Sequence, residues 1–256
     1  MKLMYATDMD RTIIYSQRFL DEYPPDCEYE VAEKKDDRVI SYISSEVKKQ
    51  LTELNKQSKV EIVPVTTRSW DEFNRIDLGF KTRYAIISNG GIILEKGKPM
   101  KDWEKYIREN INIADLLSAK MDLDEISCTI RDTKLIDNRY LFNKIEDTKL
   151  YSLEIQQLIS RYPNISFVIQ RNKVYGVPKA FSKAIAVRWL QNKIKADTLV
   201  ASGDSELDLP MLAIANYAVT PKHGSLYKDG YVLDGRLAEE GINSPLYTID
   251  LINKIN

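Results

Sequence analysis

The sequence is short of the residues that many metal sites need. Its 256 residues include one histidine, His223, and two cysteines, Cys27 and Cys128, which stand far apart. One histidine excludes a multi-histidine zinc site, and the absence of a CxxC pair argues against a thiolate one. Two separated thiols are typical of a reducing compartment, so we expect a cytoplasmic protein with both cysteines free.

The net charge is close to zero and no long hydrophobic run occurs. Both facts limit the kinds of partner that the protein is expected to bind. Lys and Arg total 37, Asp and Glu total 38, and the formal net charge is −1. This balance lacks the basic excess of a nucleic-acid-binding protein. No apolar run approaches the roughly 18 residues of a membrane span. We expect a small-molecule partner, no nucleic acid, no membrane, and a monomer or weak dimer.

The first dozen residues hold the strongest signal that is present. An apolar run at residues 3–7 leads into two carboxylates, Asp8 and Asp10. Such a run predicts a buried strand, and residues two apart on a strand lie on the same face. Burying two like charges together costs free energy unless a cation offsets them. The stretch therefore predicts a metal ion, a basic side chain, or both.

Strands and helices alternate on both sides of a central segment. This rhythm predicts an α/β, Rossmann-like core with a mainly parallel sheet. The turn Asn89-Gly90-Gly91, between two apolar runs, predicts a hairpin. Ser44 is the expected N-cap of a helix, and a later helix is expected to bury Phe181, Ile185 and Trp189. The expected strands are 59–65, 84–88, 197–202 and 216–220, and the expected helices are 44–57, 71–76, 182–193 and 246–255.

Between these parts the pattern changes to helices with one-sided strands, which predicts an inserted α+β domain. We expect residues 1–96 and 177–256 to form the core and 97–176 the insert. The expected helices of the insert are 103–121 and 150–162, and its expected strands are 125–131, 139–143, 165–169 and 173–177. Polar positions on the strand at 125–131 are the candidate substrate contacts of the insert: Ser127, Thr129 and Arg131.

Residues 16–38 form an irregular, charge-rich excursion in which 28–32 is expected to be one strand of a small ribbon. Two interpretations stay open: a solvated surface segment, or a flap over the acids of the first strand.

Several expected core strands end in polar residues. In an open parallel sheet, ligands bind beyond the carboxyl ends of the strands, so these side chains should share one crevice. Carboxylates, a hydroxyl and an ammonium group suit Mg²⁺ beside a phosphate. The residues concerned are Asp8, Asp10, Thr66, Lys183, Asp204 and Asp208.

Four motifs occur in order along nearly the whole chain: Asp8-Met9-Asp10-Arg11-Thr12, Thr66-Thr67-Arg68, Lys183, and Gly203-Asp204-Ser205-Glu206-Leu207-Asp208. Together they resemble the haloacid dehalogenase (HAD) superfamily of aspartyl-phosphate phosphohydrolases. The insert falls between the second and third motifs, which is similar to members with a class II cap, of the Cof and sucrose-phosphatase types.

The resemblance implies a role for each matched residue. Asp8 would be the nucleophile and Asp10 the general acid and base, while Thr66 would donate a hydrogen bond to the phosphoryl group. Lys183 would neutralise charge, and Lys179 competes with it for this role. Mg²⁺ would be held by Asp8, the Asp10 carbonyl and Asp204, with Asp208 either a ligand through water or a partner for Lys183.

Departures from the family pattern concern the substrate. Arg11 replaces the usual glycine, which we expect the turn to tolerate only if its φ stays negative. Arg11, Thr67, Arg68 and Asn89 are candidate substrate contacts, although Arg68 has a surface ion pair as its alternative. His223 is expected in a surface loop.

The resemblance implies a Mg²⁺-dependent phosphatase for a small phosphorylated metabolite, with sugar phosphates as one candidate class. The alternatives are a phosphomutase of the same fold and a non-catalytic module that binds phosphorylated ligands.

Overall fold

The computed structural model describes residues 2–126, 132–146, 148–170, 172–231 and 236–256. The chain divides into two compact units, one of Met1–Pro99 with Lys183–Asn256 and one of Met100–Ser182. The domain boundaries expected from the sequence, at 97 and 176, stay a prediction. No helix in the described part of the chain is long and apolar enough to cross a bilayer.

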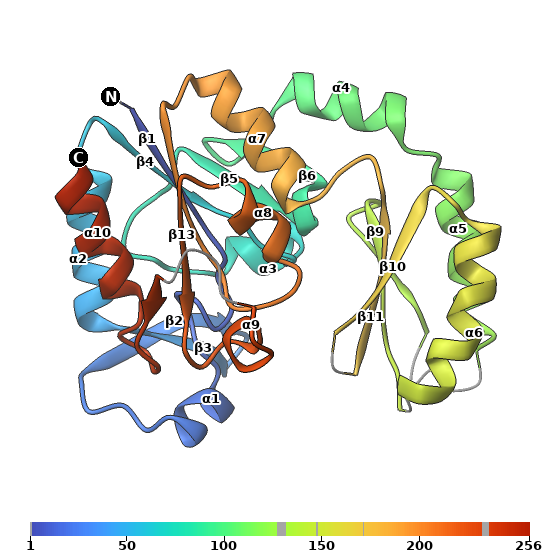
Figure 1. Cartoon of the computed structure of the whole chain (residues 1–256), viewed down its shortest axis with the longest axis horizontal. Coiled ribbons are helices and arrows are strands. Elements are labelled where there is room, and N and C mark those ends of the chain that lie inside the picture. Colours follow the sequence, from blue (N-terminus) through green and yellow to red (C-terminus); the bar gives the residue numbers. More distant parts are fainter. Residues whose placement is uncertain (1, 127–131, 147, 171, 232–235) are drawn as a thin grey trace. The chain divides into compact units, whose positions relative to one another are not determined.

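The first unit is built on a five-stranded parallel sheet with the order β14-β13-β12-β1-β4 (Figure 1). Strand β1 is wholly buried and pairs with β12 and β4 on either side. The predicted parallel α/β core is therefore confirmed. The strands are β1 (Leu3–Thr7), β4 (Val60–Pro64), β12 (Thr198–Ser202), β13 (Tyr217–Pro221) and β14 (Leu237–Ala238).

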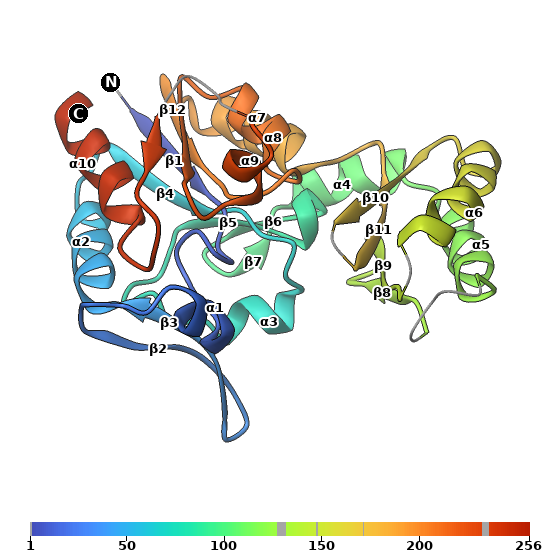
Figure 2. The same ribbon diagram turned by 60° about the horizontal axis from the view of Figure 1, so that its bottom comes forward.

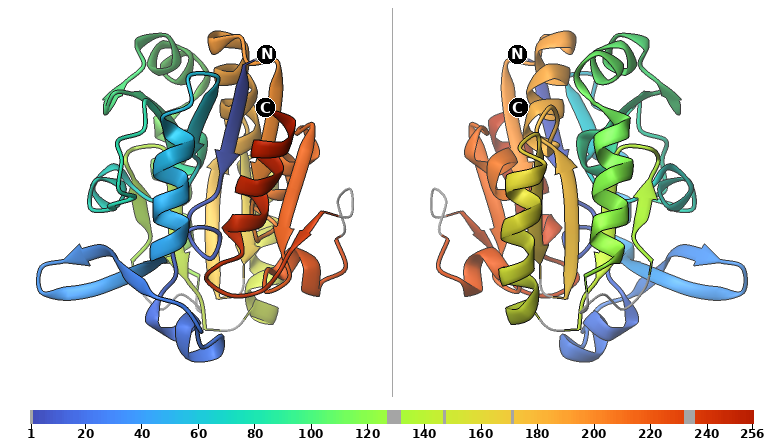
Figure 3. Two further views of the ribbon diagram at one scale, coloured as in Figure 1. Left: turned by 90° about the vertical axis from the view of Figure 1, so that its left-hand side faces the viewer. Right: turned by 90° about the vertical axis from the view of Figure 1, so that its right-hand side faces the viewer.

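Two amphipathic helices, α2 (Ser45–Asn55) and α10 (Pro245–Ile255), lie side by side on one face of this sheet (Figure 3). Ser44 caps α2 as predicted, since its hydroxyl accepts a hydrogen bond from the Val47 amide at 3.4 Å. The apolar stripe of α2 packs with the sheet and α10 into the main core. The cap sets where α2 begins, and the apolar stripe sets which side of the helix packs on the sheet.

Helices α7 (Lys183–Ile194) and α8 (Leu209–Ala213) pack against each other, and α8 contacts β12 and β13. The predicted buried face of α7 is correct for Phe181, which is buried just before the helix begins, and wrong for Ile185, which is 40% exposed. The buried positions within the helix include Ala186, Val187 and Leu190. Two stripes at helical spacing compete in this segment, and the one with smaller side chains fits the packed side of the helix.

Smaller elements complete the first unit. The predicted ribbon is confirmed as an antiparallel pair of β2 (Tyr29–Lys35) and β3 (Arg38–Ser44), which projects as a long hairpin after α1 (Gln17–Glu22) (Figure 2). The Asn-Gly-Gly hairpin is confirmed as β5 (Tyr84–Ile87) and β6 (Ile92–Glu95), joined through the 3-10 turn η1 (Ser88–Gly90). The remaining elements are α3 (Trp70–Asn74), β7 (Lys98–Pro99) and α9 (Ser225–Lys228).

The second unit has a four-stranded antiparallel sheet of order β10-β11-β9-β8 with helices α5 and α6 packed on it. The predicted α+β character and the closing hairpin are confirmed. The strands are β8 (Lys134–Ile136), β9 (Tyr140–Lys144), β10 (Ile165–Gln170) and β11 (Lys173–Pro178). The helices are α4 (Lys101–Asn110), α5 (Ile113–Asp124) and α6 (Thr148–Arg161).

The single helix expected at 103–121 is wrong. Ile111 leaves the helix with φ −114° and ψ 127°, and Asn112 then starts α5 by accepting a hydrogen bond from the Ala114 amide at 3.0 Å. An asparagine that caps a new helix competes with continuation of the old one. Ser127, Cys128, Thr129 and Arg131 lie outside the described residues.

Candidate active site

Three parallel strands bring their carboxyl ends together at one edge of the sheet. Asp8 follows β1, and its amide donates a hydrogen bond to Ser202 O in β12 at 2.9 Å. On the other side, the Val65 amide after β4 donates to Thr7 O at 2.7 Å. The residues that follow the three strands, including Thr66 and Asp204, are therefore collected around Asp8, as the strand-end argument predicts.

Three buried carboxylates meet there: Asp8, Asp204 and Asp208, which we call the carboxylate cluster. Lys183, in the first turn of α7, places Nζ 2.5 Å from Asp8 Oδ1 and 2.6 Å from Asp208 Oδ1. Its side chain is 2% exposed. Of the two competing lysines, Lys183 is thus the one beside Asp8, whereas Lys179 is exposed and belongs to the second unit.

The charges of the cluster are not balanced by the lysine alone. Burial and the neighbouring carboxylate of Asp208 raise the pKa of Asp8 well above its usual value, against the opposing effect of Lys183. Burial lowers the pKa of Lys183, but the carboxylates of Asp208 and Asp8 outweigh burial and raise it. Lys183 is therefore firmly charged, and Asp8 sits in an excess of negative charge.

This excess fits a hard divalent cation. One oxygen from each carboxylate of the cluster lies within 4.8 Å of the others, and carboxylate oxygens are the ligands that Mg²⁺ prefers. A bound cation would reverse the sign of the effect on Asp8, because it favours the ionised form. The Asp10 carboxylate is not in this group, and the expected contribution of its backbone carbonyl stays a prediction.

Asp208 uses both of its oxygens within the protein. Oδ1 accepts from Lys183, while Oδ2 accepts from the amide and the hydroxyl of Ser205 at 3.1 and 2.9 Å. Of the two roles left open for Asp208, the structure displays the partnership with Lys183. Gly203 is required for this approach, since a Cβ there would lie 2.5 Å from the Cβ of Asp208.

Asp10 turns toward a different set of charges. Arg68 Nε and Nη2 donate to the two oxygens of Asp10 at 2.8 and 2.7 Å, and Arg68 Nη1 donates to Glu33 Oε2 at 2.5 Å. Glu33 Oε1 also accepts from Arg75 Nε at 3.0 Å. We call these four residues the arginine network. Of the two alternatives for Arg68, the structure displays an ion pair, which joins it to the half-exposed Asp10 and to the fully buried Glu33.

The second motif and the hairpin turn hold each other in place. Thr66 is buried, its Oγ accepts from the Arg68 amide at 3.1 Å, and its carbonyl accepts from the Asn89 amide at 2.9 Å. Ser88 and Asn89 both adopt left-handed backbone, with φ of 52° and 58°. Such strain persists where the surrounding hydrogen bonds over-determine the turn. The substrate contacts expected for Thr67, Arg68 and Asn89 stay predictions.

Arg11 differs from its expectation in two ways. Its φ is +62°, so the expectation of a negative φ is wrong. Its guanidinium turns to the protein: Nε lies 3.3 Å from Asp204 Oδ2, and the group stacks 5.0 Å from the centre of the Phe19 ring. Arg11 thus supplies a second cation to the carboxylate cluster, and its predicted contact with substrate stays a prediction.

His223 contacts the backbone of this turn, and its expected place in a surface loop is wrong because it is fully buried. The Gly241 amide donates to Nδ1 at 3.1 Å, so the proton sits on Nε2, which donates to Arg11 O at 2.7 Å. Burial lowers the pKa of His223 to about 4, which keeps the ring neutral and the tautomer fixed.

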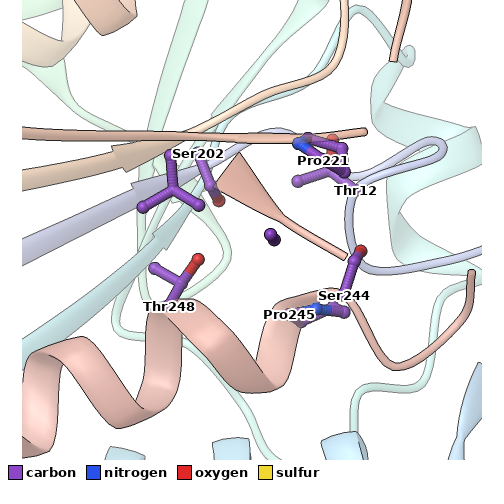
Figure 4. A pocket seen from close by; sticks show the side chains of 8 residues that line it. Thr12, Ser202, Pro221, Ser244, Pro245 and Thr248 are labelled. Carbon is purple, nitrogen blue, oxygen red and sulfur yellow. The ribbon is translucent and has the colours of Figure 1, made fainter. Parts of the chain in front are cut away.

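A small pocket lies beside the same loop (Figure 4). Its eight lining residues include Thr12, Ser202, Ser244 and Thr248, and none of the eight has an ionisable side chain. Thr12 connects the two places, because its hydroxyl donates to Asp8 Oδ2 at 3.3 Å. The charged chemistry therefore belongs to the carboxylate cluster and not to this pocket.

Sequence reasoning missed Glu33 and His223. Glu33 lies in a run of charged residues, which by composition is typical of a solvated face, and no periodicity separates it from its neighbours. A lone histidine between Pro221 and Gly224 likewise has the pattern of a loop. Thr12 belongs to the first motif, but no role is predicted for it from the sequence. The structure shows that its hydroxyl donates a hydrogen bond to Asp8.

Comparison with known proteins finds solved structures of similar fold, but no match by sequence. No protein-family model and no curated protein matches the chain. The sucrose-phosphatase from Synechocystis sp. PCC6803, solved with sucrose and phosphate, is 12% identical with a TM-score of 0.67, and the match covers 98% of each chain. A phosphatase of the haloalkanoate (HAD) superfamily from Bacteroides thetaiotaomicron is 15% identical with a TM-score of 0.68, covering 100% of this chain and 96% of that one.

A HAD subclass IIB sugar phosphatase is 9% identical with a TM-score of 0.63, and the match covers 100% of this chain and 99% of that one. These likenesses extend over the insert as well as the core. They confirm, at the level of the fold, the resemblance that the four motifs indicate. Identities this low establish the fold alone, and the fold of this chain is that of the HAD superfamily.

Proposed function

We propose that this protein is a phosphatase that hydrolyses the phosphate monoester of a small metabolite through a phosphorylated Asp8. One observation carries the proposal: a buried carboxylate at the end of β1 is grouped with two further acids and held by a buried lysine at 2.5 Å. A carboxylate so placed is a nucleophile in a site built to offset the charge of a phosphoryl group.

The first step forms one bond and breaks another. A carboxylate oxygen of Asp8 attacks phosphorus, and the bond from phosphorus to the alcohol oxygen breaks. Asp10 gives the departing oxygen its proton, for which one of its oxygens carries that proton while the other still accepts from Arg68. Lys183 offsets charge on the oxygens of the transferring group and keeps Asp8 in position.

The second step releases phosphate. Water attacks phosphorus, Asp10 takes the proton of that water, and the bond from phosphorus to Asp8 breaks. This restores the Asp8 carboxylate and the protonated Asp10 with which the first step begins. The pose shown by the structure suits this step, because Arg68 holds Asp10 as a hydrogen-bond acceptor. Thr66, buried beside the strand ends, is proposed to donate to a phosphoryl oxygen.

Magnesium is the cation that we propose for the carboxylate cluster, with Asp8, Asp204 and the Asp10 carbonyl as its ligands. When bound, it would offset negative charge on the transferring phosphoryl group. We propose further that the second unit acts as a cap that selects the substrate, with sugar phosphates as the first class to test. Support comes from the sugar phosphatases among the structural relatives, whose folds match over the whole chain.

The test is hydrolysis of p-nitrophenyl phosphate with Mg²⁺ or with EDTA, in the wild type and in Asp8→Asn. We expect turnover in the wild type with Mg²⁺ only, and none in Asp8→Asn. Equal rates for the two proteins would refute the proposal. A panel of sugar phosphates, followed by release of inorganic phosphate, separates hydrolysis from phosphoryl transfer back to a sugar, which releases none.

A further inference from the structure

The ribbon residue Glu33 is buried where the pattern of its strand would leave an acid exposed. It lies 1% exposed in β2, between a buried Ala32 and an exposed Lys34. A regular strand alternates its faces, so in a ribbon with one solvent-exposed face an acid that follows a buried residue would point to solvent. The register of β2 against β3 shifts on both sides of Glu33, and these bulges turn its side chain inward.

The backbone around Glu33 is tied to the segment that follows α3. Glu33 forms an isolated bridge with Ile76, and the Asp77 amide donates to Ala32 O at 2.8 Å. The ribbon is therefore hydrogen-bonded to the core at this residue, although its tip projects from it (Figure 2). Residues 16–38 are therefore not only a solvated surface segment, because they bring the Glu33 side chain into the arginine network.

Both oxygens of Glu33 are used by guanidinium groups. Oε2 accepts from Arg68 Nη1 at 2.5 Å, and Oε1 lies 2.9 Å from Arg75 Nη2 and accepts from Arg75 Nε at 3.0 Å. A buried carboxylate needs such partners, because an unpaired one is very costly. Arg75 already compensates the negative charge of Glu33. The contact between Glu33 and Arg68 therefore has a further effect, which is to orient the Arg68 side chain.

The guanidinium of Arg68 is a rigid plane with donors on two sides. Glu33 holds the Nη1 corner, and the opposite edge, Nε with Nη2, forms the two-pronged contact with Asp10. Because the plane cannot flex, fixing one corner fixes the direction in which the other edge points. The Asp10 carboxylate is half exposed, and both of its oxygens accept from this edge of the guanidinium.

The geometry points to Glu33 as a positioning residue for the proton-transferring carboxylate, acting from the ribbon through Arg68 on Asp10. This inference rests on the proposed function, since Asp10 transfers protons only if the protein is a phosphatase. Glu33 itself touches neither the carboxylate cluster nor the reacting group. Its removal should therefore harm proton transfer to the leaving group and spare the binding of substrate.

Leaving-group dependence separates this role from a purely structural one. p-Nitrophenolate departs readily without a proton, whereas the more basic phenolate depends on one. For Glu33→Gln we expect kcat to fall about 10-fold with phenyl phosphate and by less than about 3-fold with p-nitrophenyl phosphate, a part of the 10²–10⁴ that general acid catalysis supplies. KM should stay within about twofold for both, and Glu33→Asp, which keeps the charge, should restore part of the loss.

The matched control is Glu30→Gln in the same strand. Glu30 pairs with Lys48 at 2.8 Å and its side chain is 46% exposed, so this variant removes a β2 carboxylate without reaching Arg68. It should leave both rates unchanged. In an Arg68→Gln background, Glu33→Gln should add nothing, because its effect passes through Arg68. Equal losses on the two esters, or a Glu33 variant as active as Glu30→Gln, would overturn the inference.

A structural measurement keeps the inference testable if the wild type hydrolyses neither ester, a result that would count against the proposed function instead. A crystal structure of Glu33→Gln should then show Arg68 no longer donating to both oxygens of Asp10. An unchanged two-pronged contact would overturn the positioning role. If Glu33→Gln does not fold, as judged by thermal unfolding, Glu33→Asp takes its place. Its shorter side chain should shift Arg68 and weaken its two-pronged contact with Asp10 without abolishing it.

Discussion

Replacing Asp8 with asparagine should abolish phosphate release and, in the absence of metal, make the protein more stable. The carboxylate cluster contains three buried acids, and its ion pairs bring two cations to it, Lys183 and Arg11. One negative charge is left over. Asp8→Asn keeps the shape of the side chain and removes this charge, after which Lys183 still pairs with Asp208 and Arg11 with Asp204.

The size of the effect follows from the burial of that charge. An imperfectly compensated buried polar or charged group costs about 1–3 kcal/mol or more. For a protein of this size each kcal/mol moves Tm by about 2–4 °C, so we expect Asp8→Asn in EDTA to melt about 2–12 °C above the wild type.

The sign of the pH dependence is also fixed. The raised pKa of Asp8 means that the folded state holds its proton more tightly than the unfolded state. Stability of the wild type must then fall as pH rises from about 4 toward the raised value. Asp8→Asn lacks this loss, so its advantage should widen with pH across that window.

The assay is thermal unfolding in EDTA at pH 5 and pH 8, alongside phosphate release with Mg²⁺. Asp10→Asn is the control, since it makes the same chemical change two residues away on a side chain that is 52% exposed and paired with Arg68. It should lose activity without gaining stability, because an exposed ion pair contributes only about 0–1 kcal/mol. If Asp8→Asn melts at or below the wild type at both pH values, the cluster does not carry a surplus charge.

Three further outcomes follow from the same contacts. Lys183→Met leaves two buried carboxylates without their cation, so we expect a loss of about 3–5 kcal/mol in urea unfolding at pH 7 and no phosphate release. His223, whose pKa burial lowers to about 4, stabilises the fold fully only above its ordinary value near 6.5. Between pH 6.5 and 4 the wild type should therefore lose about 3 kcal/mol more than His223→Gln does in the same unfolding assay. Arg11→Gly suits the left-handed backbone and removes a cation from Asp204, so calorimetry should show Mg²⁺ binding about 10-fold tighter than in the wild type.

Much of the fold was accessible from the sequence because its signals are local. The mostly apolar run of β1, the cap at Ser44 and the Asn-Gly-Gly turn each specify their own element, and each prediction is confirmed. The errors arise where two local solutions compete. At Asn112 a cap interrupts what reads as one helix, and in α7 two apolar stripes are available and only packing chooses between them.

The site was partly accessible for a different reason. Parallel strands end at a common edge, so polar residues directly after strands, such as Asp8 and Asp204, are collected by topology without any knowledge of side-chain packing. Glu33 and His223 reach the site by other means, a bulge in a ribbon and a buried loop. No periodic pattern or motif spacing in the sequence marks either residue. Both depend on contacts with residues more than 30 positions away.

The two acids of the first motif differ because of what each one meets. In the arginine network, two guanidinium groups face two carboxylates, so the charges balance and nothing there attracts a further cation. In the carboxylate cluster the acids outnumber the nearby cations, and the raised pKa of Asp8 reflects this. A divalent ion would therefore be attracted to the cluster and not to the Asp10 carboxylate, although the two aspartates are only two residues apart. Charge balance thus supports the proposed roles, in which Asp8 takes part in metal and phosphoryl chemistry and Asp10 exchanges a proton.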